Sequence, residues 1–127
     1  MKAYIHIKEQ YIPIFRGKLV IILSNSVKRV KKHIPDFGHS ELYAHAILQD
    51  WHGIEGYIIV LNFDNKERQI FPGAIAHEAV HCAHMLADCR DVVADFENDE
   101  TIAYLVEWIT DEAYKFVYEK GFNITSP

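Results

Sequence analysis

The sequence has no apolar run that approaches the roughly 18 residues needed to cross a membrane. Residues 1–8 alternate between polar and apolar side chains, which is unlike the apolar core of a secretory leader. Its only cysteines, Cys82 and Cys89, lie in one predicted helix, too far apart along its axis for a disulfide. Two reduced thiols suit a reducing compartment. We therefore expect a cytoplasmic protein with no membrane partner.

Excess positive charge is also missing, as are repeats and linkers. The chain has 13 Lys and Arg residues against 18 Asp and Glu residues, a net charge of −5. This balance argues against nucleic acid as the main partner. No internal repeat, low-complexity segment or Pro/Gly/Ser-rich linker divides the 127 residues. We expect one domain over residues 1–127, long enough to form its own core.

The N-terminal half has the residue patterns of strands. Residues 3–8 alternate, and two apolar runs, 11–15 and 18–23, flank Arg16-Gly17 and predict a hairpin. The second run is apolar on both faces, which predicts a central strand. Residues 41–49 fit either a strand or a short helix, and the turn residues at 50–53 favour the strand. Residues 56–63 predict a further strand.

Helical patterns dominate the rest of the chain. A short helix is expected over residues 27–34, where Pro35 stops it. A longer one should run from Pro72-Gly73 to about Cys89, and a second from a cap at Asn98 to Lys120, with Gly121 as its stop. Strands followed by long helices predict an α+β fold. Its small mixed or antiparallel sheet should come from the N-terminal half and pack on the two C-terminal helices.

The segment His77-Glu78-Ala79-Val80-His81 matches the H-E-x-x-H pattern inside a predicted helix. Residues four apart lie on one face of a helix. The two imidazoles can therefore reach one cation, for which Zn–N bonds of roughly 2.0–2.1 Å are needed. Glu78 lies one step around the helix and can act on a metal-bound water without ligating. The alternative is an ordinary helix that carries two core or surface histidines.

A catalytic zinc usually takes three protein ligands and one water. Ala87 stands six residues after His81, where an extended form of the motif has a third histidine, so a three-histidine site is excluded. Glu100, which follows His81 by 19 residues and falls in the next predicted helix, is the favoured third ligand. Glu97 and Glu107 are its rivals. Glu107 could instead hydrogen-bond a ligand histidine.

Together, His77-Glu78-Ala79-Val80-His81 and Glu100-Thr101-Ile102-Ala103 resemble the glutamate-ligand branch of the zincin superfamily. Residues 98–105 are also similar to small zincin-like proteins encoded by bacteriophages and prophages. The resemblance covers about residues 54–110. It implies a minimal zincin, with Zn²⁺ between the two long helices and an edge strand over the cleft. Tyr104 stands where larger members of this branch often have an aspartate.

The favoured function is that of a zinc-dependent metallopeptidase in which Glu78 activates a zinc-bound water to hydrolyse peptide bonds. A peptide or protein substrate would add as an extended strand to residues 56–63 or 42–48. Three side chains are candidate donors to the oxyanion, namely His45, Tyr57 and Tyr104. The alternative is a non-catalytic, zinc-bearing phage or host-interaction module with a structural metal site. A domain without metal is the third possibility.

Overall fold

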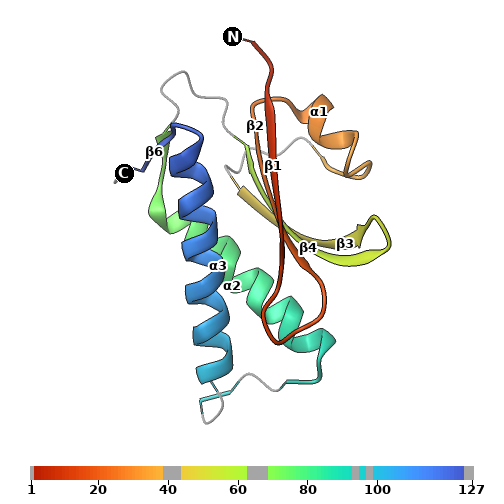
Figure 1. The fold of residues 1–127 in the computed structure, drawn as a ribbon, viewed down its shortest axis with the longest axis vertical. Helices are drawn as coiled ribbons and strands as arrows, with labels where there is room; N and C mark the ends of the chain where they lie inside the picture. The colour runs from red at the N-terminus through yellow and green to blue at the C-terminus, as the bar shows by residue number, and fades with distance from the viewer. Residues whose placement is uncertain (1, 39–43, 63–68, 93–94, 97–98, 125–127) are drawn as a thin grey trace.

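A computed structural model describes residues 2–38, 44–62, 69–92, 95–96 and 99–124 of the chain. Within these ranges the chain forms strands and helices in an order that places most strands first (Figure 1). The elements are β1 (Ile5–Tyr11), β2 (Lys18–Ser24), α1 (Val27–Lys31), β3 (Ala44–Trp51), β4 (Ile54–Asn62), β5 (Gln69–Ile70), α2 (Pro72–Cys89), α3 (Glu100–Glu119) and β6 (Asn123–Ile124).

The predicted α+β fold is confirmed. Among the described residues, the N-terminal half forms a four-stranded mixed sheet in the order β1-β2-β4-β3. β2 runs parallel to β4, whereas β1 and β3 each pair antiparallel with their neighbour. β2 is therefore a central strand, as its unbroken apolar run predicts. β5 and β6 form a separate short parallel pair.

Two cores, one on each face of the sheet, explain why β2 is apolar throughout. Leu19, Ile21 and Leu23 belong to the larger core, which α2 and α3 complete. Val20 and Ile22 alternate with them and belong to the smaller core, under α1 and the segment that follows it. Successive strand residues point to opposite faces. The chain thus has three layers, with the two long helices together on one face (Figure 1).

The predicted strand over residues 11–15 is wrong. β1 continues to Tyr11, and β1 itself forms the hairpin with β2, from Ile5 opposite Ser24 to Tyr11 opposite Lys18. Residues 12–17 form the connection between them. Pro13 has no N–H to give to a sheet ladder. Ile14 has a φ of 71° and Gly17 a φ of 104°, and neither fits an extended strand.

β3 confirms the strand interpretation of residues 44–49, while residues 41–43 lie outside the described ranges. It joins β4 through His52-Gly53, whose φ angles of 51° and 88° suit a type I′ turn. Ala44 and Ala46 face the larger core, and both are small enough to let α2 approach the sheet. β3 is therefore an edge strand that packs against α2.

The helices follow their predicted bounds closely. α1 ends at Lys31 and not at residue 34, because the chain tightens into a turn before Pro35. α2 has its predicted bounds, and α3 ends before Gly121, whose φ of 78° confirms it as the helix stop. The cap position of α3 is Asp99, one residue after the predicted cap Asn98, which itself lies outside the described residues. None of the described helices has the length and apolar character required to span a bilayer.

Gly56 of β4 offers a direct test of the packing between β3 and β4. A Cβ at Gly56 would lie 2.8 Å from Trp51 Cβ and 2.9 Å from the carbonyl oxygen of Gln49. We expect Gly56→Ala to lower the free energy of unfolding by about 1–3 kcal/mol, the usual cost of overpacking. Urea denaturation measures this.

Gly73→Ala is the matched control, because a Cβ at Gly73 in α2 meets nothing within 4 Å. Alanine is a better helix former than glycine, so the control should leave stability unchanged or raise it by up to about 1 kcal/mol. Equal destabilisation by both substitutions would contradict the described packing of β3 on β4.

Candidate metal centre

α2 carries the H-E-x-x-H segment with one buried and one exposed face. Pro72 at its start is favoured at the first helical position, where the missing N–H costs nothing. Ile75, Ala79 and Cys82 lie in the larger core. His77 and His81 fall on the opposite, exposed stripe. The helix therefore presents both imidazoles to solvent while its apolar stripe packs on the sheet.

The imidazoles of His77 and His81 converge. Their Nε2 atoms are 3.1 Å apart, and their ring centroids are 4.8 Å apart at an interplanar angle of 72°. Two nitrogens on one tetrahedral zinc would be about 3.3 Å apart, given bonds of roughly 2.05 Å. The same distance also suits a hydrogen bond in which one neutral ring donates to the other. The pair is thus close to the geometry that a shared ion requires.

Glu78 stands beside this pair but is buried, with 7 % of its surface exposed. Its Oε1 atom lies 3.9 Å from His77 Nε2. Among the described residues, no donor forms a hydrogen bond to its carboxylate. A buried charge without such partners costs stability.

Glu112 of α3 is equally buried, with 7 % exposed, but its surroundings are different. Its carboxylate accepts from Lys8 Nζ at 3.3 Å and from Lys115 Nζ at 3.4 Å. Glu112 therefore has the charge partners of a structural carboxylate, which Glu78 lacks.

Both cysteines are free, as the sequence predicts. Cys82 is buried one turn after Glu78. Burial and, second, the negative charge of Glu78 raise the pKa of its thiol to about 12. Because metals bind the thiolate, Cys82 is a poor candidate for a ligand. Cys89 is exposed at the end of α2.

The predicted third ligand, Glu100, is the first residue of α3 and is exposed. It shares a helical stripe with Glu107 and Asp111, which are exposed as well. The opposite stripe of α3, including Leu105 and Ile109, is buried in the larger core. This helical register turns Glu100 toward solvent.

The structure thus brings two of the three predicted ligands together. Within the described ranges, no three side chains of His, Cys, Asp or Glu lie close enough to hold a metal ion. Glu100 is therefore not placed beside His77 and His81. Glu97, one of its rivals, lies outside the described residues, and Glu107 is exposed on α3. The third position of the site stays a prediction.

The three candidate oxyanion donors lie in different environments. His45 is on the α1 side of the sheet, with its ring centroid 5.8 Å from that of Phe37, and so faces away from α2. Tyr57 is buried, and its hydroxyl donates to Glu55 Oε2 at 2.9 Å. Burial, followed by hydrogen bonds with Cys89 and Glu55, raises the Tyr57 pKa. Tyr104, 46 % exposed on α3, is the most exposed of the three residues.

Arg90 fixes the C-terminal end of α2 against the sheet. Its Nη2 atom donates to Glu55 Oε2 at 2.8 Å and to the carbonyl oxygen of Arg16 at 3.0 Å. Glu55 begins β4 and also accepts from Tyr57, so one carboxylate joins the helix end to the strand.

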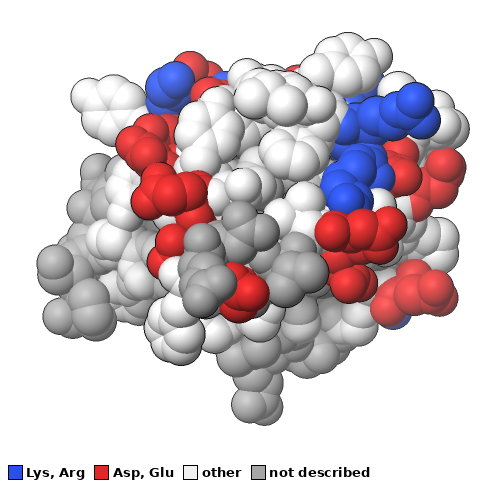
Figure 2. Space-filling model, turned by 90° about the horizontal axis from the view of Figure 1, so that it is seen from below, with Lys and Arg blue, Asp and Glu red and all other residues white. Residues whose placement is uncertain are grey.

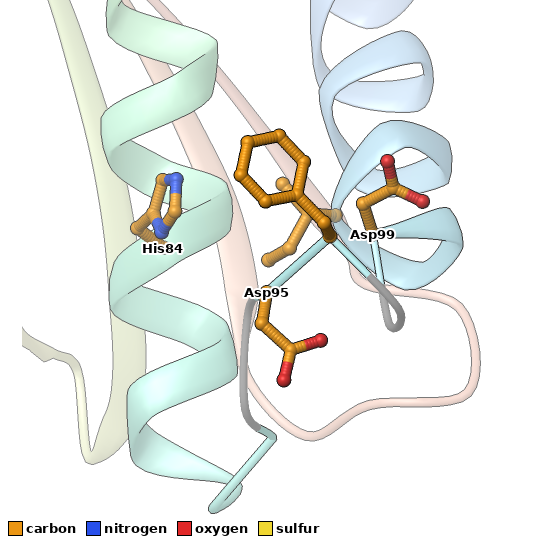
Figure 3. Close-up of a pocket in the computed structure, with 5 residues that line it drawn as sticks. His84, Asp95 and Asp99 are labelled. Carbon is orange, nitrogen blue, oxygen red and sulfur yellow. The ribbon is translucent and has the colours of Figure 1, made fainter.

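A hollow of about 600 Å³ lies between α2 and the start of α3, and sequence reasoning missed it. Figure 3 shows His84 on α2 to one side, Asp99 at the start of α3 on the other, and Asp95 below them with its carboxylate pointing away from both. Phe96 and Ile102 supply the apolar lining. The only sequence signal was that His84 continues the stripe of His77 and His81 by another turn.

The described side chains therefore supply a convergent histidine pair and a neighbouring buried carboxylate on one helix. Imidazole nitrogens are suitable donors for zinc. Comparisons with protein-family models, with curated proteins and with solved structures found no match.

Proposed function

We propose that the protein is a zinc-dependent hydrolase of peptide bonds, with His77 and His81 as ligands and Glu78 as the general base. The observation that carries the proposal is the 3.1 Å separation of the two Nε2 atoms beside the buried Glu78 carboxylate. The two imidazole nitrogens are suitable ligands for zinc. A carboxylate must complete the protein ligands, and Glu100 remains the first candidate because it opens the neighbouring helix.

A zinc ion held there would polarise the scissile carbonyl and make a bound water more acidic. Glu78 is well suited to accept a proton from the attacking water, because its carboxylate has no hydrogen bond to other described residues. It would then pass this proton to the leaving amine.

The outer edge of β3 supports an extended peptide as the substrate. β3 is an edge strand of the described sheet and packs against α2, the helix that carries the histidine pair. Unpaired N–H and C=O groups on such an edge can bind a peptide by strand addition. The proposed substrate is therefore an extended segment of a peptide or protein.

Removal and return of zinc tests this function. We expect purified protein to hold one zinc per chain and to cleave members of a mixed peptide library. A chelator should stop cleavage, and stoichiometric zinc should restore it. Glu100→Gln, Glu107→Gln and Glu97→Gln variants would then identify the third ligand, and we expect only Glu100→Gln to weaken zinc binding strongly.

Each outcome of this experiment decides between the candidate functions. Stoichiometric zinc without cleavage of any peptide would favour a non-catalytic zinc-bearing module. Absence of zinc, with a melting temperature that the chelator does not change, would contradict both metal-dependent functions.

A further inference from the structure

We infer that the hollow between α2 and α3 binds a lysine or arginine side chain of the substrate, next to the histidine pair. This inference rests on the proposed function and adds the class of substrate. It names a specific contact, in which Asp99 lies near the cationic group while Ile102 and Phe96 contact its methylene stem.

The position of the hollow connects it to the proposed site. His84 lines it and follows His81 by three residues on the exposed stripe of α2, a rise of about 4.5 Å along the helix. The volume of about 600 Å³ is in the range of sites that bind small ligands. A peptide held near His81 could therefore place a neighbouring side chain in this space.

The lining of the hollow matches a long basic side chain at both of its ends. Ile102 is partly buried against the larger core, and Phe96 is fully exposed, so both offer apolar surface to a ligand. Asp95 and Asp99 are exposed acids of the same lining. Lysine and arginine place their methylene groups on apolar surface and their charge near water and carboxylates. Norleucine has the methylene groups that fit the apolar surface but lacks the positive charge.

The charge of the helical half favours the same substrate. Residues 72–127 contain eleven Asp or Glu residues but only three Lys or Arg residues. Figure 2, which shows the molecule from below, has more acidic than basic surface on this side. Exposed acids lie on both long helices, among them Asp88, Glu100, Glu107 and Asp111. A field of one sign attracts ligands of the opposite charge and raises their rate of association.

A peptide series tests the inference. Fluorogenic peptides of one sequence would carry Arg, Lys, norleucine or Glu at each position in turn around the scissile bond. At one position we expect kcat/KM to be about two- to fivefold higher for Lys or Arg than for norleucine, the size of a single exposed charged contact. Glu should be the poorest residue there.

One variant assigns this preference to the hollow. Asp99→Asn should reduce the ratio of kcat/KM for the Lys peptide to kcat/KM for the norleucine peptide by several fold, because it lowers kcat/KM for the Lys peptide. The Asp99 side chain makes no capping hydrogen bond to α3, so its replacement by asparagine should not disturb the fold. Asp36→Asn, an exposed aspartate outside the helical half, is the matched control.

A binding measurement separates this inference from the proposed function. Fluorescence anisotropy of the labelled Lys and norleucine peptides on Glu78→Gln protein needs no hydrolysis. Tighter binding of the Lys peptide, lost in Asp99→Asn, would support the inference even if wild type cleaves nothing. Equal kcat/KM and equal affinity for the Lys and norleucine peptides would overturn the inference. So would a preference for Lys that Asp99→Asn leaves unchanged.

Discussion

Glu78→Gln is expected to lower kcat by about 10²- to 10⁴-fold, the usual contribution of a general base. Zinc content should stay at one per chain, because Glu78 lies beside the ligands and is not itself one. Stability should not fall either, since the substitution removes a buried charge that has no hydrogen bond to other described residues. Steady-state kinetics, metal analysis and urea denaturation of one preparation provide these readouts.

Glu112→Gln is the matched control for this variant. Both glutamates are 7 % exposed and lie on the long helices, but Glu112 pairs with Lys8 and Lys115. Its replacement should cost about 1 kcal/mol of stability, because both ion pairs are partly exposed, and should leave kcat unchanged. If both variants lost activity equally, or if Glu78→Gln kept full activity with bound zinc, Glu78 would not be the base.

His77→Ala and His81→Ala are each expected to weaken zinc binding by more than about 100-fold. Removal of a group that only supports a ligand typically costs 10- to 100-fold in affinity, and removal of a ligand itself should cost more. The stability of the metal-free protein should change little, because both residues are exposed and the His77 side chain is 67 % exposed. Competition with a chromophoric chelator measures the affinity.

Thermal melting gives an independent readout of the same substitutions. Free zinc at about 100 times its Kd stabilises the folded chain by about 2.7 kcal/mol, so wild type should melt at a higher temperature with zinc. His77→Ala and His81→Ala should lose this shift. His84→Ala is the control, because His84 lies on the same stripe but lines the hollow. Loss of zinc binding in His84→Ala alone would place the ion elsewhere on α2.

The fold was largely predictable because its signals are local. The unbroken apolar run of β2 needs two buried faces, and the layers on both sides of the sheet supply them. The pattern of α2 gave both ends of the helix and the shared stripe of His77 and His81. The hairpin was misplaced because residues 11–15 are apolar, although Pro13 and the positive φ of Ile14 make this segment a connection.

The site was predictable only where one helix determines it. Spacing within α2 brings His77 and His81 together, and the structure places their Nε2 atoms 3.1 Å apart. The position of Glu100 depends on the rotation of α3 about its own axis, which follows from the burial of Leu105 and Ile109. The hollow depends on the spacing between two helices. Neither property can be read from a pattern along one segment.

X-ray absorption spectroscopy of the zinc-loaded wild-type protein tests the convergence of His77 and His81 on one ion most directly. The account predicts one zinc per chain, bound by two imidazole nitrogens at about 2.0–2.1 Å together with oxygen ligands. A spectrum with one imidazole or none, or with sulfur from a cysteine in the coordination shell, would contradict it.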